Sequence, residues 1–218
     1  MKRKLKIDII SDVVCPWCTI GYKRLEKAIK NLGIEDQIEL EWQPFELNPN
    51  MPSEGQNLQQ HLAEKYGAGP EQHAQMQQQM KAAGAEVDFV FNYNDDMRMS
   101  NTFEAHILLE YAKEFDKQTE LKMILTKSFF TNNNDVSDRE ILKQALQEAE
   151  LNVEEAFSRL EDKETQKEIR DKQNYWKNLG VNSVPTIVFD RKSAVTGAQP
   201  VEVFEKVLQE AINESNQS

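Results

Sequence analysis

Cys15 and Cys18 are the only cysteines in the 218 residues, and Pro16 and Trp17 lie between them. Two cysteines placed at random would show this spacing in roughly one chain in a hundred, so the pair needs a chemical reason. In a reducing compartment a permanent structural disulfide is not expected. Dithiol–disulfide chemistry, metal binding and two inert buried thiols remain. We predict the first, because CxxC at a strand-to-helix junction is the redox signature.

A zinc site is the main competing interpretation of the pair. A structural zinc ion takes four ligands, and CxxC supplies two of them. The remaining candidates are three histidines without the close spacing of a paired ligand set: His61, His73 and His106. Residues 132–135 lack the spacing, the glycine and the terminal glutamate of an EF-hand loop, so we interpret them as an ordinary loop. The sequence therefore predicts no metal site.

The place of the pair in the chain predicts a role for each cysteine. Residues 5–10 alternate apolar and polar side chains as a strand does, and apolar residues recur at helical spacing after the pair. Pro16 belongs in the first turn of that helix, where its missing N–H costs nothing. The first-turn N–H groups and the helix macrodipole favour a thiolate at Cys15, and a thiolate is the species that attacks a disulfide. Cys18 lies one turn further in, where it is placed to resolve a mixed disulfide on Cys15.

Strand patterns follow the helix and return at the end of the chain. A second strand is expected at residues 38–42, ending near Pro44. Near the C-terminus we expect strands at residues 184–189 and 194–196 and a helix that opens at Pro200. These elements predict a strand, a helix and a strand, then a long insertion, then two strands and a helix.

The middle of the chain is rich in Gln, Glu, Lys and Ala and shows helical spacing. Ser137 and Glu140 have capping-box spacing before one helix, and residues 89–91 are interpreted as loop or turn. We therefore predict one domain formed by residues 1–56 and 179–218 and an all-helical insertion formed by residues 57–178. The helices of the insertion are expected at residues 57–66, 70–83, 100–115, 118–130, 138–149 and 152–179.

Charge and hydropathy patterning exclude several classes of partner. The net charge is −11, so a phosphate-binding function would work against the field of the protein. Nucleic-acid binding is not expected, because the basic residues near the N-terminus form only a weak patch: Lys2, Arg3, Lys4 and Lys6. No run approaches the roughly 18 apolar residues of a membrane span. Charged residues also interrupt the apolar run that a secretory leader would need, so we expect a cytoplasmic protein with no membrane partner. The expected oligomeric state is a monomer or a homodimer.

Several motifs together resemble the DsbA family of thioredoxin-fold proteins. They are CPWC at residues 15–18, NTxxAH at 101–106, DVSD at 135–138, VPT at 184–186 and GAQP at 197–200. The closer resemblance is to the FrnE-like branch, which is related to the 2-hydroxychromene-2-carboxylate isomerases. It covers nearly the whole chain and implies an α/β thioredoxin fold, βαβ–ββα, with a large all-helical insertion.

The resemblance also implies a substrate-binding segment. In the family, the proline that matches Pro185 is cis and faces the CxxC, and the backbone beside it pairs with an extended substrate. We carry this role over to Val184, Pro185 and Thr186. The chain departs from the family pattern at Asn182 and Ser183, where relatives commonly have a glycine before the Val-Pro pair.

Three further residues are candidates for supporting the site. Pro16 and Trp17 form the dipeptide that borders both sulfurs, and Trp17 is expected to be exposed. Trp17 either contacts substrate and tunes the reduction potential, or is a rim residue packed on the insertion. His106 lies near the site if the family match holds in space; the alternative is a structural histidine on a helix.

The sequence predicts a thiol–disulfide oxidoreductase that uses its CPWC dithiol on protein or small-molecule disulfides. No bound cofactor is expected, and glutathione or another outside thiol must recycle the pair because the chain has no third cysteine. One alternative is a glutathione-dependent isomerase or transferase on the same fold, although those relatives carry serine where Cys15 stands. The other alternative is a non-enzymatic binding or holdase module that uses the insertion as its surface.

Overall fold

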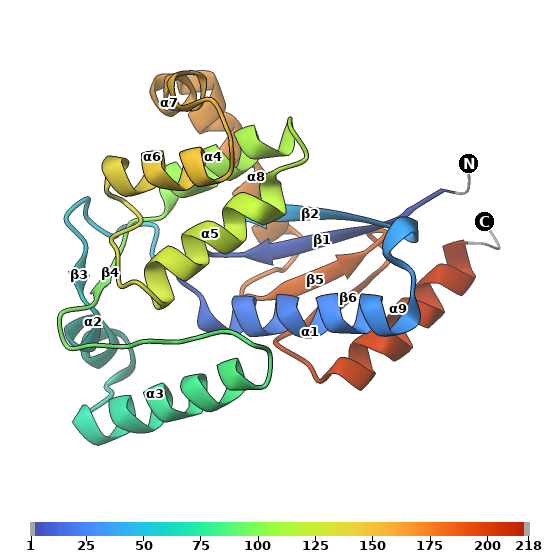
Figure 1. Ribbon diagram of the computed structural model, residues 1–218, viewed down its shortest axis with the longest axis horizontal. Coiled ribbons are helices and arrows are strands. Elements are labelled where there is room, and N and C mark those ends of the chain that lie inside the picture. The colour runs from blue at the N-terminus through green and yellow to red at the C-terminus, as the bar shows by residue number, and fades with distance from the viewer. Residues whose placement is uncertain (1–2, 216–218) are drawn as a thin grey trace.

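A mixed sheet forms the centre of the protein in the computed structural model, which describes residues 3–215 (Figure 1). Within these residues its strand order is β2-β1-β5-β6. The strands are β1 (Leu5–Ser11), β2 (Ile38–Pro44), β5 (Thr186–Phe189) and β6 (Ser193–Thr196). β2 runs parallel to β1, whereas β5 is antiparallel to both β1 and β6. This is the α/β thioredoxin fold, as expected, with the helical insertion between β2 and β5.

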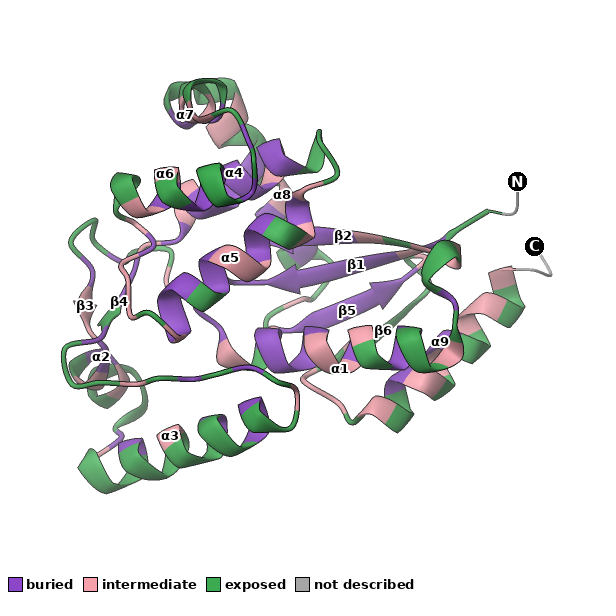
Figure 2. Ribbon diagram, in the orientation of Figure 1, coloured by how far each residue is buried: buried purple, intermediate pink, exposed green. Residues whose placement is uncertain are grey.

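Alternate strand residues cover the two faces of the sheet. On one face, Ile9 and Ile187 pack against the helices α1 (Pro16–Leu32) and α9 (Val201–Ser215), which lie side by side (Figure 1). On the other face, the next residue along β1, Ile10, packs with Val188 and with Trp176 of α8. Because both faces are covered, β5 is buried along its length and β1 is buried at every residue except Lys6 (Figure 2).

The insertion holds helices and one two-stranded ribbon. The ribbon pairs β3 (Gln56–Asn57) with β4 (Arg98–Met99) and is not foreseen from the sequence, because two-residue strands carry no periodicity. The helices are α2 (Leu58–Tyr66), α3 (Pro70–Ala85), α4 (Phe103–Lys113), α5 (Gln118–Phe130), α6 (Arg139–Glu148), α7 (Val153–Glu161) and α8 (Lys163–Asn178). No helix within residues 3–215 is long and apolar enough to cross a membrane.

Two expectations about helix ends are corrected. The helix expected at residues 152–179 is two helices, because Asp162 ends α7 and its carboxylate caps α8 by accepting hydrogen bonds from the N–H groups of Glu164 and Thr165. The cap of α6 is Asp138 and not Ser137, since the carboxylate of Asp138 accepts the N–H of Glu140 at 2.8 Å. The expected loop at residues 89–91 is confirmed.

The insertion and the sheet domain share apolar contacts. Val13, Val14 and Ile20, which flank or follow the cysteine pair, belong to the apolar cluster of the insertion. Met123 of α5 packs against that cluster and also against the cluster of the sheet. The boundaries 1–56, 57–178 and 179–218 stay a prediction, and residues 1, 2 and 216–218 lie outside the described part, as does Lys2 of the basic patch.

Gly84 of α3 allows the following loop to cross the helix closely. A Cβ atom at this position would lie 2.5 Å from the carbonyl oxygen of Phe89 and 2.5 Å from Cδ2 of Phe91. We expect Gly84→Ala to lower the free energy of unfolding by about 1–3 kcal/mol, the usual cost of overpacking. Urea unfolding measures it, with Gly69→Ala as the control because an added methyl group there would meet no described atom within 4 Å. Equal losses in the two variants would contradict the argument.

Glu41 of β2 predicts an acid-sensitive contribution to stability. Burial opposes ionisation, but Nζ of Lys113 at 2.5 Å and Nζ of Lys6 at 2.6 Å hold the pKa of Glu41 at about 2, below its ordinary 4.5. A lowered pKa means that the stabilisation is complete above pH 4.5 and is lost as the pH falls through 2. Lys113 is partly exposed, so we expect Glu41→Gln to cost about 1–2 kcal/mol at pH 7. This loss of unfolding free energy should be smaller in urea titrations at pH 2.5 than at pH 7. Glu39→Gln is the control, because Glu39 is exposed. Equal losses in Glu41→Gln at both pH values would exclude a stabilising role of this ion pair.

Candidate active site

Cys15 caps the N-terminus of α1 with its own side chain. Its Sγ accepts the N–H of Cys18 at 3.3 Å, and its backbone is extended while Pro16 opens the helix. The strand-to-helix junction therefore places the first sulfur on the free N–H groups of the helix end, as the spacing predicts. Both cysteines are free thiols.

The segment before β5 faces Cys15. The Val184–Pro185 peptide bond is cis, and Sγ of Cys15 lies 3.9 Å from the carbonyl oxygen of Val184. Gly21 of α1 makes this approach possible, because a Cβ atom there would lie 3.2 Å from Cγ of Pro185. The hydroxyl of Thr186 donates to the carbonyl of Ser183 at 2.8 Å. The structure thus brings Val184 and Pro185 to the Cys15 side of α1, and the substrate-binding role of Val184, Pro185 and Thr186 stays a prediction.

Cys18 is enclosed more completely than Cys15, with exposed fractions of 1% and 4%. Burial raises the pKa of the Cys18 thiol well above its ordinary value, and the hydrogen bond and charge of Cys15 raise it further. The ammonium of Lys122 acts in the opposite direction. Cys15 is therefore the more exposed sulfur and Cys18 the one whose ionisation is opposed, while the roles of attacking and resolving thiol stay a prediction.

Asp12 holds the loop that carries the cysteines. Its carboxylate accepts the N–H of Val13 at 2.8 Å and the N–H of Leu47 at 2.7 Å. Burial opposes its ionisation, but the hydrogen bond and charge of His106, the N–H of Leu47 and the charge of Lys122 together keep the pKa of Asp12 below its ordinary value. Asp12 therefore stays a carboxylate that ties the active-site loop to the segment after β2.

His106 lies behind the site and not beside the substrate. It is 3% exposed, and its Nε2 is 3.0 Å from the carbonyl oxygen of Phe45 and 3.3 Å from Oδ1 of Asp12. His106 thus lies where a structural histidine would, which is the alternative named in the sequence analysis. Its contact toward the cysteine loop is made through Asp12.

Lys122 of α5 is a buried cation beside the thiols that sequence analysis did not identify. It is 2% exposed, and within the described chain its Nζ has no hydrogen-bond partner. The ammonium lies 5.1 Å from the centre of the Trp42 ring. Burial lowers the pKa of Lys122, while the charges of Cys18, Asp12 and Cys15 raise it. Its position three residues before Leu125 and seven before Phe129 puts a charge on an apolar helix stripe, which is the signal that could have identified it.

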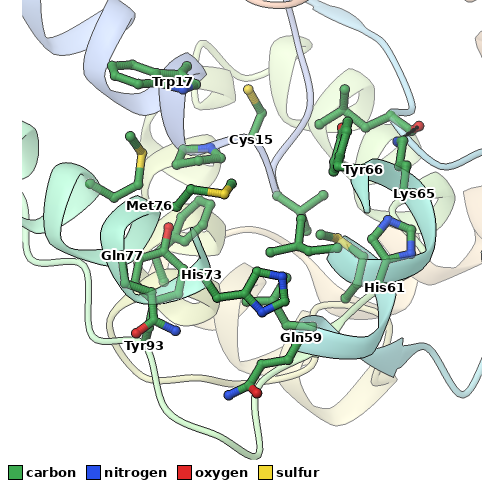
Figure 3. Close-up of a pocket in the computed structure, with 18 of the residues that line it drawn as sticks. Cys15, Trp17, Gln59, His61, Lys65, Tyr66, His73, Met76, Gln77 and Tyr93 are labelled. Atoms are coloured by element: carbon green, nitrogen blue, oxygen red, sulfur yellow. Dashed lines mark hydrogen bonds between the residues drawn. The ribbon is translucent and has the colours of Figure 1, made fainter. Parts of the chain in front are cut away.

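A pocket of about 420 Å³ opens beside Cys15 (Figure 3). Cys15, Pro16, Trp17 and Val184 line one part of it, and side chains of α2 and α3 line another. Trp17 is exposed, as expected, with an exposed fraction of 36%. No pattern in the sequence indicates that α2 and α3 face the thiols, because these helices are distant from CxxC along the chain and carry no motif.

Tyr93 and two histidines also line the pocket. Burial, and then the charge of Cys15, raise the pKa of Tyr93, so its hydroxyl stays protonated. His61 of α2 and His73 of α3 line the pocket, whereas His106 of α4 does not. Among residues 3–215, no three His, Cys, Asp or Glu side chains gather as metal ligands would.

Comparison with known proteins agrees with this geometry. Residues 6–209 match the DSBA-like thioredoxin domain family. The uncharacterized protein YwbO of Bacillus subtilis (strain 168) is 28% identical over 203 residues, which span 93% of this chain and 94% of YwbO.

Solved structures share the architecture. The probable DsbA oxidoreductase SCO1869 from Streptomyces coelicolor has a TM-score of 0.90 and 32% identity, covering 96% of this chain and 91% of that one. The cytosolic disulfide reductase DsbM from Pseudomonas aeruginosa, solved with GSH, has a TM-score of 0.65 and 13% identity, covering 95% and 99%, and so shares the fold alone. With its cysteine pair at the start of α1, this chain belongs to the DSBA-like thioredoxin domain family.

Proposed function

We propose that the protein is a thiol–disulfide oxidoreductase that reduces disulfides with the Cys15–Cys18 dithiol, using glutathione or a similar thiol as the outside reductant. The observation that carries the proposal is the free Sγ of Cys15, which accepts a helix N–H beside cis-Pro185 and lines a pocket. A cytosolic reductase of the same fold was solved with GSH, which supports glutathione as the reductant here.

The proposed reaction moves two electrons from the dithiol to the substrate. The thiolate of Cys15 attacks one sulfur of the substrate, a mixed disulfide forms, and the other sulfur leaves as a thiolate that takes up a proton. Cys18 then loses its proton and attacks Sγ of Cys15, which releases the second substrate thiol and leaves a Cys15–Cys18 disulfide. Two molecules of the outside thiol reduce that disulfide and are themselves oxidised to one disulfide.

The two other functions make different demands on the cysteines. A glutathione-dependent isomerase or transferase does not need Cys18, and its relatives have serine where Cys15 stands. A binding or holdase module needs neither cysteine. The enclosed Cys18, whose backbone N–H contacts Sγ of Cys15, supports the dithiol reaction.

Turnover measurements on cysteine variants test the proposal. Reduction of bis(2-hydroxyethyl) disulfide by glutathione, coupled to NADPH oxidation through glutathione reductase, reports the activity. We expect Cys15→Ser to lower the rate at least about a hundredfold, because serine is a far weaker nucleophile toward sulfur. Full activity in Cys18→Ser would favour the glutathione-dependent alternative, and full activity in the double serine variant would favour a binding module.

A further inference from the structure

The pocket controls access to Cys15. The residue is only 4% exposed, so a substrate sulfur must come to it through the pocket or through a rearranged rim. A volume of about 420 Å³ falls within the range of sites that bind small molecules. A folded protein surface is poorly suited to reach so enclosed a sulfur, whereas a compact molecule fits the space beside it.

The walls of the pocket are largely apolar. Among the described lining residues Lys65 alone carries a permanent charge, and its Nζ already contacts the carbonyl of Leu47 at 3.0 Å and Oδ1 of Asn48 at 2.6 Å. A ligand with several carboxylates would therefore lose hydration without gaining ionic partners. The apolar walls come from Val14, Leu58, Leu62, Met76, Met80, Met99, Phe129 and Phe130.

One buried polar atom among the lining residues, Nε2 of His73, lacks a hydrogen-bond partner in the described part of the chain. His73 is 6% exposed, and its Nε2 is buried with no hydrogen-bond partner within residues 3–215. The other histidine of the pocket, His61, is already paired through Nδ1 with Oε1 of Gln56 at 2.9 Å. Figure 3 shows Cys15 and Trp17 on one side of the pocket and His73 on the other. Because an unpaired buried nitrogen is costly, a polar ligand atom at His73 would be favourable.

We infer that this pocket binds a compact, uncharged disulfide with a largely apolar body, whose one polar group pairs with Nε2 of His73 while its sulfurs lie at Cys15. The inference rests on the proposed function and names its substrate class; the electron transfer is the one given above, with an outside thiol as reductant. Glutathione, oxidised or reduced, is then a poor ligand of the pocket, so as the reductant it would act by a brief encounter of its thiolate with the Cys15–Cys18 disulfide and not from a stable complex.

Protection of Cys15 from alkylation tests the inference without turnover. Octanamide is a sulfur-free mimic that has an apolar chain and one uncharged polar group. We expect it to slow the reaction of Cys15 with iodoacetamide, read by mass spectrometry, while S-methylglutathione gives no protection at ten times the concentration. Absence of protection by octanamide would overturn the inference. Equal or stronger protection by S-methylglutathione, or by S-carboxymethylated insulin B chain as an extended peptide, would overturn it as well.

Variants of the two histidines test the polar contact. His73→Leu should raise the half-protecting octanamide concentration about fivefold, the factor expected for one hydrogen bond, with each variant's own alkylation rate in the absence of octanamide as the reference. His73→Gln should restore protection, and His61→Leu is the matched control that should change it little. Equal weakening in His73→Leu and His61→Leu would overturn the assignment of His73. Since alkylation needs no reductant, a protein that is protected but inactive would refute the proposed function and leave this ligand preference standing.

Discussion

Cys18→Ser should accumulate a mixed disulfide on Cys15, to about one per protein molecule, when the reduced protein meets a disulfide in the absence of an outside thiol. The physical reason is geometric, because Cys15 lines the pocket while Cys18 is enclosed behind it with its N–H on Sγ of Cys15. Without the second thiol, nothing inside the protein attacks the mixed disulfide. Intact-mass measurement followed by peptide mapping identifies the modified residue.

Cys15→Ser is the matched control for this trap. It keeps Cys18 but removes the sulfur that the pocket exposes, so it should form no stable adduct under the same conditions. Adducts that accumulate on Cys18 in this variant, at the rate seen for Cys15 in Cys18→Ser, would reverse the order of attack proposed above.

The pH dependence of alkylation separates the two thiols in the reduced wild-type protein. Burial and the neighbouring Cys15 raise the pKa of Cys18, so less of its thiolate is present at any given pH. We expect Cys18 to react with iodoacetamide only at higher pH than Cys15 does, as measured by mapping the labelled peptides. Equal labelling of both cysteines across the titration would contradict the burial argument.

Lys122→Met should slow the release step about tenfold and leave the fold at least as stable as the wild type. The ammonium favours the Cys18 thiolate, so its removal should raise the pKa of Cys18 further and shift the pH profile of release upward. A buried cation without a hydrogen-bond partner among the described residues is costly, and methionine has a similar length without the charge.

Quenched single-turnover experiments measure the rate of the release step in Lys122→Met. The mixed disulfide is followed by acid quench and mass spectrometry over a range of pH, and urea unfolding measures stability. Lys127→Met on the same helix is the control, because Lys127 is exposed. If release had the same rate and pH profile in Lys122→Met as in the wild type, Lys122 would have no part in ionising Cys18.

Local patterns in the sequence predicted most of the elements and pointed to Cys15 and Cys18 as the candidate reacting sulfurs. The alternation at residues 5–10 and the CxxC after it predict a strand followed by a helix that begins at the cysteines, because both signals act over a few neighbouring residues. The break at Asp162 was missed, since an aspartate within a polar helical run changes the spacing little and becomes a cap only when the chain turns there.

The surroundings of the sulfurs were decided by tertiary structure alone. Lys122 and His73 lie far from CxxC along the chain, and neither belongs to a motif that would place it beside the sulfurs. Tertiary packing buries both side chains and removes them from water, which makes their unpaired nitrogens costly. The sequence by itself therefore predicted which sulfurs exchange electrons, whereas the fold decided which groups lie beside Cys18 and which side chains line the approach to Cys15.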